Sequence, residues 1–108
     1  VYKRQAMSIS KQYLKTKPVC KVTFTFAGHQ YPQAQSVALA GEFNNWDPQA
    51  VLMKKTKTGD FTASLNLDKE KQYQFRYVVD GQTWLNDDEA DAYVPTQVSY
   101  DQNSVVQL

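Results

Sequence analysis

The sequence predicts an all-β protein, an antiparallel β-sandwich with a short N-terminal helical segment. Three observations predict it: runs in which apolar and polar residues alternate, turn residues between these runs, and little helical periodicity. Short strands separated by turns favour two packed antiparallel sheets. We expect one domain over residues 18–108, with residues 1–17 as an N-terminal appendage.

The N-terminal segment is the one place where a helix is expected. Residues 8–17 are basic and polar, and Ile9 and Tyr13 stand at the i, i+4 spacing of one or two helical turns, which Pro18 would end. Residues 1–5 resemble a translated sequencing-adaptor scar, with a natural start expected at Met7. Residues 1–5 are therefore not expected to contribute to function.

The strands follow one another with clear alternation. In the first, Cys20–Phe26, the residues Cys20, Val22, Phe24 and Phe26 share one face. Further strands are predicted over 36–43, 51–55, 61–67, 72–79, 83–85 and 104–108, and an acidic, polar loop over 86–101. In the strand over 72–79, the side chains of Gln74, Arg76 and Val78 point away from an aromatic face.

Composition limits the classes of function. The chain has 108 residues, is 42% hydrophobic and 21% charged, and carries a net charge of +1, so it is globular and nearly neutral. Neither nucleic acid nor a membrane is an expected partner, since there is no basic patch and no apolar run near the roughly 20 residues that cross a bilayer. One cysteine and no export signal favour a cytoplasmic location.

Catalysis finds little support in the sequence. His29 is the one histidine and has no patterned partner, and Cys20 lies on an apolar strand face where a thiol acts as a small hydrophobic group. No nucleophile elbow or phosphate-binding glycine loop is present. The acidic run Asp87, Asp88, Glu89 and Asp91 lacks the spacing of a calcium loop and is interpreted as a solvated loop. We predict no catalytic residue, no metal site and no cofactor.

Two tryptophans are the most informative residues. Trp46 and Trp84 each stand at a strand end among polar turn residues. They either plug the end of the sandwich or offer flat faces on which a sugar ring could stack, because the C–H face of a sugar is attracted to an aromatic face. Arg76 and Asn103 are candidates to bind sugar hydroxyls, although a strand arginine is by default a solvated charge.

Several motifs resemble a known family. The runs Gly41–Trp46 and Tyr73–Gly81, then Trp84, then Asn103–Val106, are similar to the glycogen-binding modules of the isoamylase early-set type, which occur in the β subunit of AMP-activated protein kinase and ahead of the barrel in branching and debranching enzymes. The chain also resembles small stand-alone bacterial members of this family, which begin with a short basic segment and Lys-Pro-Val-Cys.

The resemblance implies an immunoglobulin-like fold, an α-1,4-glucan ligand and a set of binding residues. Trp46 and Trp84 match the two stacking tryptophans, Arg76 stands where the kinase subunit has a lysine, and Asn103 matches an asparagine that binds glucose hydroxyls. A leucine that the kinase subunit inserts into the glucan ring has no clear match here, and Tyr100 is the candidate to take its place. One departure is the pair Gln82–Thr83 before Trp84, where the kinase family has one residue.

The functional hypothesis is therefore non-catalytic binding of glycogen, starch or maltodextrin by aromatic stacking. Two alternatives remain open. The domain is a regulatory module that binds a protein instead of a sugar, or it is the detached N-terminal module of a glycoside hydrolase or branching enzyme. The fold alone does not decide between them, so a protein or enzyme partner stays possible beside the glucan.

Overall fold

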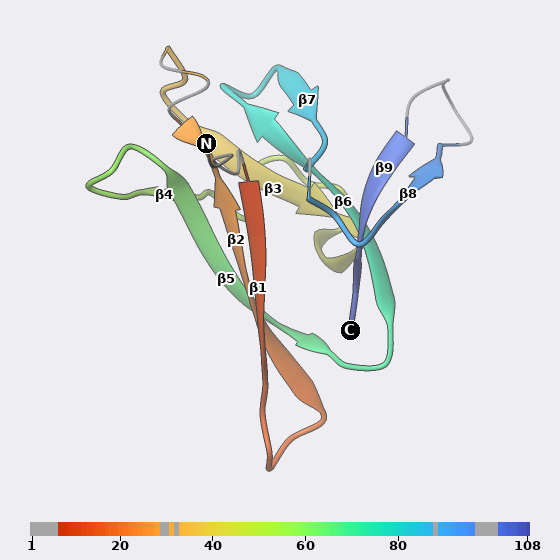
Figure 1. Cartoon of the computed structure of the whole chain (residues 1–108). Helices are drawn as coiled ribbons and strands as arrows, with labels where there is room; N and C mark the ends of the chain where they lie inside the picture. The colour runs from red at the N-terminus through yellow and green to blue at the C-terminus, as the bar shows by residue number, and fades with distance from the viewer. Residues whose placement is uncertain (1–6, 29–30, 32, 88, 97–101) are drawn as a thin grey trace, which may run out of the picture.

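The chain folds into two antiparallel sheets packed as a sandwich (Figure 1). The computed structural model describes residues 7–28, 31, 33–87, 89–96 and 102–108. The first sheet has the order β1-β2-β5-β4 and the second the order β3-β6-β9-β8, with β7 also paired to β6. The bounds are β1 Met7–Tyr13, β2 Val19–Phe26, β3 Val37–Gly41, β4 Lys54–Lys55, β5 Phe61–Asp68, β6 Gln72–Val79, β7 Thr83–Leu85, β8 Ala92–Pro95 and β9 Gln102–Gln107.

This strand order is that of an immunoglobulin constant-type domain. In that fold one sheet holds strands A, B, E and D, and the other holds C, F and G. Here β1, β2, β5 and β4 take the first set of places, and β3, β6 and β9 take the second. The predicted immunoglobulin-like sandwich is confirmed, and β7 and β8 are additions to the second sheet.

The expected N-terminal helix is wrong, because residues 7–13 form strand β1. This strand pairs with β2 over seven residue pairs, from Met7 opposite Phe26 to Tyr13 opposite Cys20. The spacing of Ile9 and Tyr13 fits both structures, since residues four apart share a face in a strand as well as in a helix. Pairing with the edge of β2 favours the strand over the helix, and Ile9 then packs against the core.

Two other differences concern short strands. Four residues of the expected loop over 86–101 form β8, which pairs with β9. The expected strand over 51–55 is reduced to β4 and an isolated bridge between Leu52 and Ala38. Both are edge segments, whose pairing depends on the neighbouring strand and leaves little trace in their own sequence.

The core lies between the sheets and is rich in aromatic residues. Phe24 and Phe26 of the first sheet meet Phe75 and Tyr77 of the second, with ring centroids 5.1 Å apart for Phe24–Phe75 and 5.2 Å apart for Phe26–Tyr77. These four side chains are fully buried, as is Cys20. The alternation predicted for β2 and β6 is therefore confirmed, and the core fixes which face of β6 turns outward.

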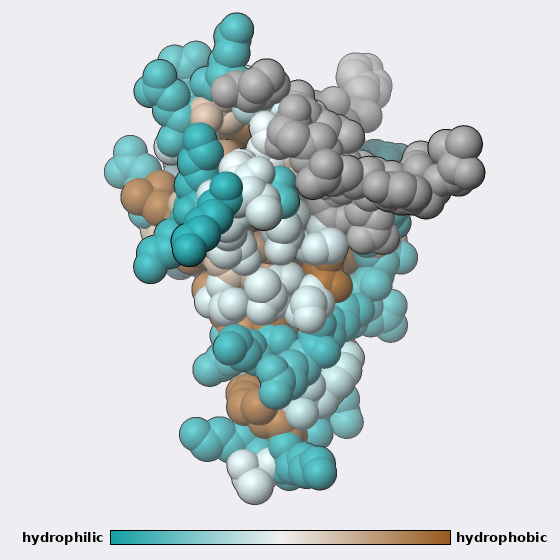
Figure 2. Space-filling model, turned by 60° about the vertical axis from the view of Figure 1, so that its left-hand side comes forward, coloured by the Kyte–Doolittle hydropathy of each residue, from teal (hydrophilic) through white to brown (hydrophobic). Residues whose placement is uncertain are grey.

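The outward face of the first sheet is polar. Thr23 and Ser64 stand opposite each other on β2 and β5, and their hydroxyl oxygens lie 2.9 Å apart. On the face that Figure 2 shows, hydrophobic residues are scattered among hydrophilic and neutral ones. No helix among the described residues is long and apolar enough to cross a membrane.

Candidate functional site

The turn after β3 directs Trp46 onto the outer face of the second sheet. Its first residue, Gly41, has no room for a side chain: a Cβ there would lie 2.6 Å from the carbonyl oxygen of Gln74 and 2.8 Å from the Cβ of Phe75. Asn44 then closes the turn, because its Oδ1 accepts a hydrogen bond from the Gly41 amide at 3.0 Å and its Nδ2 donates to the Leu39 carbonyl at 2.8 Å.

The backbone conformation completes this turn. Asn45 and Trp46 both adopt positive φ angles, 57° and 60°, and the Trp46 amide donates to the Gly41 carbonyl at 2.8 Å. An asparagine tolerates this left-handed conformation well, and tryptophan does so only where the surroundings hold it. The hydrogen bonds around Gly41 supply that hold.

Two further contacts anchor the turn to the sandwich. The Glu42 carboxylate accepts a hydrogen bond from the backbone amide of Gln74 at 2.7 Å. The Phe43 ring lies between Phe24, at a centroid distance of 6.1 Å, and Tyr73, at 6.2 Å. Phe43 thus packs against the core, whereas Trp46 packs against the outer face of the sheet. This division explains why the motif contains both a phenylalanine and a tryptophan.

Trp46 rests on a small apolar floor outside the core. Ala38, Ala40 and Val78 form a second buried cluster, and half-buried Trp46 packs against it. Small alanines leave room for the indole to lie close to the sheet. The structure thus places Trp46 on the outside of the second sheet and not at the end of the sandwich.

Trp84 lies on the same outer face. It stands opposite Val78 in the pairing of β6 with β7, and directly opposed residues in a sheet share a face. Its side chain is 39% exposed. The chain reaches this position through a tight turn at Asp80 and Gly81, both of which have positive φ angles. The Oδ1 atom of Asp80 also accepts hydrogen bonds from the backbone amides of Gln35 and Ser36.

Three polar side chains form a hydrogen-bonded row beside the tryptophans. The Nε of Arg76 donates to Oδ1 of Asn103 at 2.8 Å, and Nδ2 of Asn103 donates to Oε1 of Gln74 at 2.9 Å. Asn103 is 9% exposed, and Arg76 and Gln74 are half-buried. These residues and the two tryptophans surround the apolar floor, and we call this surface the tryptophan face: Ala38, Ala40, Trp46, Gln74, Arg76, Val78, Trp84 and Asn103.

A buried polar cluster lies beneath this surface. The Tyr77 hydroxyl donates to Oδ2 of Asp87 at 2.7 Å, and the Asp87 amide donates to the Ser104 hydroxyl at 2.9 Å. Ser104 in turn donates to Oδ1 of Asn86, whose Nδ2 donates to the Gln102 carbonyl. This cluster fastens the segment after Trp84 to the strand that carries Asn103, so it fixes the two residues relative to each other.

The acidic run is only partly as expected. Asp87 is fully buried, so the interpretation of the run as a solvated loop is wrong at this residue. Asp91 pairs with Lys11 at 2.7 Å. Burial raises the pKa of Asp91, but hydrogen bonds from the Gln107 amide and from Lys11, with the charge of Lys11, outweigh burial and leave the pKa below its ordinary value.

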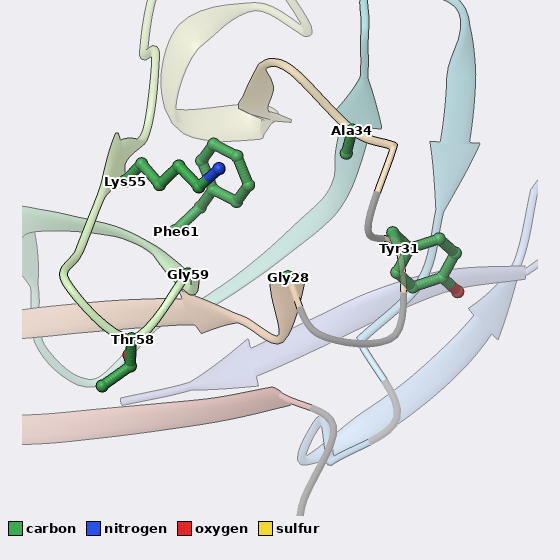
Figure 3. A pocket seen from close by; sticks show the side chains of 7 residues that line it. All are labelled: Gly28, Tyr31, Ala34, Lys55, Thr58, Gly59 and Phe61. Atoms are coloured by element: carbon green, nitrogen blue, oxygen red, sulfur yellow. The ribbon is translucent and has the colours of Figure 1, made fainter.

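A separate hollow lies at one end of the sandwich (Figure 3). Its volume is about 150 Å³. In the close-up, Lys55 and Phe61 lie on one side and Tyr31 and Ala34 on the other, and the Lys55 Nζ is 5.9 Å from the centroid of the Phe61 ring. The hollow shares no lining residue with the tryptophan face, so the two are distinct features.

Four of the five predicted binding residues therefore meet on one surface: Trp46, Arg76, Trp84 and Asn103. Tyr100 lies outside the described residues. Gln74 was not among the predicted binding residues, although the alternation of its strand predicted its outward position. Asn86 and Asp87 gave no usable signal, because their partners are distant in the sequence. In the part of the chain that the structure describes, no group of three metal-binding side chains occurs.

Comparison with known protein families gives a match that covers most of the chain. The model of a family described as the glycogen recognition site of AMP-activated protein kinase matches residues 21–105, most of the chain. No curated protein sequence matches the chain. The matched region contains every residue of the tryptophan face.

Proposed function

We propose that this chain, which belongs to the family of the glycogen recognition site of AMP-activated protein kinase, binds α-1,4-glucans on its tryptophan face. The family is one of carbohydrate-binding modules, so the chain is a binding module and not an enzyme. Glycogen, starch and maltodextrins are the proposed ligands.

The observation that carries the proposal is the presence of two partly exposed tryptophans on one sheet face, on either side of Val78. Trp46 packs against the cluster that contains Val78, and Trp84 stands opposite Val78 across the strand pair. Successive sugar rings of an α-glucan could each stack an apolar C–H face on one indole, with the attraction coming from apolar burial and ring electrostatics.

The polar row supplies the second requirement of a sugar site. Stacking alone is weakly directional, and hydrogen bonds to hydroxyls orient the ligand. Arg76 and Asn103 lie next to the apolar floor and hold each other in place through the 2.8 Å hydrogen bond. We assign to them the contacts with sugar hydroxyls, which both donate and accept hydrogen bonds.

A titration of the domain with maltoheptaose or β-cyclodextrin, followed by tryptophan fluorescence, tests the proposal. We expect saturable quenching in the natural protein. In Trp46→Ala the affinity should fall by about ten- to a hundredfold, since burying an aromatic side chain contributes about 1.5–3 kcal/mol. Trp84 remains as the reporter in that variant.

The matched control is Tyr13→Ala. Tyr13 is a 50% exposed aromatic residue of β1, in the other sheet, and its removal should leave the affinity unchanged. An absence of any response at millimolar sugar, or an equal loss in the two variants, would contradict the proposal. A folded protein without sugar affinity would favour the alternative of a protein-binding module.

A further inference from the structure

We propose that Gln74 is a further residue of the glucan-binding site, a positioning residue that fixes the orientation of the Asn103 carboxamide. The inference rests on the proposed function, because it concerns how the tryptophan face presents its polar groups to a sugar. It adds a residue that neither the sequence motifs nor the family match assigns.

The direction of the hydrogen bonds in the polar row is dictated by chemistry. An arginine side chain can only donate, so the atom of Asn103 that faces Arg76 Nε must be the carbonyl oxygen Oδ1. The Nδ2 group of Asn103 therefore faces the other way and needs an acceptor. The Oε1 atom of Gln74, 2.9 Å away, is that acceptor.

Without an acceptor at position 74, only the Arg76 contact would hold the amide. A carboxamide rotates about its terminal torsion within a broad energy minimum, so one hydrogen bond fixes it less well than two at opposite ends. Asn103 held at both ends keeps one lone pair of Oδ1 and one proton of Nδ2 in fixed directions. A sugar hydroxyl can use both, because it donates and accepts.

Gln74 also joins the polar row to the turn that carries Trp46. Its backbone amide donates to the Glu42 carboxylate at 2.7 Å, and its carbonyl oxygen lies against Gly41. The position of the Asn103 amide is thus set relative to the Trp46 turn through a single residue. This arrangement keeps the stacking surface and the hydrogen-bonding groups in register.

Two substitutions at position 74 separate positioning from shape. Gln74→Met keeps the length of the side chain and removes the acceptor, whereas Gln74→Glu keeps an acceptor for Asn103 Nδ2. We expect Gln74→Met to weaken maltoheptaose binding by roughly threefold to tenfold, the effect of one hydrogen bond. Gln74→Glu should retain most of the affinity of the natural protein.

The matched control is Gln72→Met, two residues earlier on the same strand. Gln72 is exposed and lies on the same outward face by the alternation of β6, but it does not belong to the polar row. Its substitution should leave the affinity unchanged. Melting temperatures of all variants should be measured alongside, so that a loss of fold is not read as a loss of binding.

A second readout follows the amide itself. In the free natural protein and in Gln74→Glu, the two side-chain Nδ2 protons of Asn103 should give separate, well-dispersed NMR resonances. In Gln74→Met the resonance of the proton that pointed at Gln74 should move toward the value of a solvated carboxamide, because it loses its hydrogen-bond acceptor. A purely structural role for Gln74 would lower stability without this change at Asn103.

Several outcomes would overturn the inference. Unchanged affinity and unchanged Asn103 resonances in Gln74→Met would show that the amide is held without Gln74. An equal loss in Gln72→Met would show that the effect is not specific to the polar row. If the natural protein binds maltoheptaose but the variants do not behave as expected, this inference fails and the proposed function stands. If the natural protein does not bind maltoheptaose, both fail.

Discussion

Gly41 is the residue on which the position of Trp46 most depends. Its backbone is extended, so its role is not conformational freedom but the close approach of Gln74 and Phe75 to its Cα. A side chain here would collide with strand β6, to which Gly41 is paired. The glycine of the motif thus permits the contact between the turn and the sheet.

Gly41→Ala should therefore destabilise the protein. The added methyl group would meet a backbone oxygen at 2.6 Å, so β3 or β6 must shift, and we expect the free energy of unfolding to fall by about 1–3 kcal/mol. Urea denaturation followed by circular dichroism measures it. A midpoint equal to that of the natural protein would show that the turn can move away from β6 at no cost.

At the residue scale, the sequence predicts the features that arise from alternation and misses those that depend on distant partners. The outward position of Arg76 is expected from the aromatic face of its own strand, and the polar surroundings of Trp46 indicate an exposed location. The burial of Asp87 depends on Tyr77 and Ser104, 10 and 17 residues away. Because single sequences give no direct sign of such pairing, an acidic run is interpreted as solvated by default.

Among the elements, β1 differs most from the prediction, because it is a strand where a helix was expected. It covers the edge of β2 over seven residue pairs, and its Ile9 packs on the core. It contributes no residue to the tryptophan face, because it belongs to the other sheet. Stability and ligand binding should therefore respond differently to its removal.

Deletion of residues 1–17 tests this separation. We expect a lower melting temperature, since the edge of β2 loses its hydrogen-bonding partner and Ile9 leaves the core. The affinity for maltoheptaose, measured at a temperature where both forms are folded, should be unchanged. Deletion of residues 1–5 alone serves as the length control. An unchanged melting temperature after the longer deletion would mean that β1 adds nothing to the sandwich.

The accuracy of the sequence-based prediction differs between long and short strands. The long strands β2, β5 and β6 are predicted within one or two residues, because each carries several alternations. The segments β1, β4 and β8 are edge strands with few core side chains, and their structure is set by the neighbour that each one meets. The prediction is therefore best for the long strands that form the core.

On the scale of the whole molecule, the ion pair between Lys11 and Asp91 connects the two sheets. Lys11 of β1 contacts Asp91, the residue before β8, at 2.7 Å and also donates to the Gln107 carbonyl of β9 at 2.9 Å. The Gln107 amide donates to the same carboxylate. The contact closes one side of the sandwich between an edge strand of the first sheet and the second sheet.

Because of this ion pair, the stability of the protein should depend on pH. The pKa of Asp91 is lowered in the folded state from its ordinary value of 3.8, so its contribution to stability is fully present above that value and is lost as the pH falls through the lower, folded pKa. Asp91→Asn should therefore reduce stability at neutral pH, and its difference from the natural protein should shrink below pH 3.8.

Thermal unfolding of both proteins between neutral and acidic pH measures the effect. Asp68→Asn is the control, because the Asp68–Lys71 pair is 3.6 Å long and more than half exposed, so its loss should change little. A difference between Asp91→Asn and the natural protein that persists unchanged at acidic pH would contradict the assignment.

The two outer surfaces of the sandwich differ in character, with polar side chains on the first sheet and the tryptophan face on the second. The most direct test is the NMR spectrum of the labelled protein during titration with maltoheptaose. The account predicts shifts of both tryptophan indole N–H resonances, together with Arg76 and Asn103, and none at Thr23 or Ser64 on the opposite face. Shifts centred on the hollow beside Tyr31, or no shifts at saturating sugar, would contradict it.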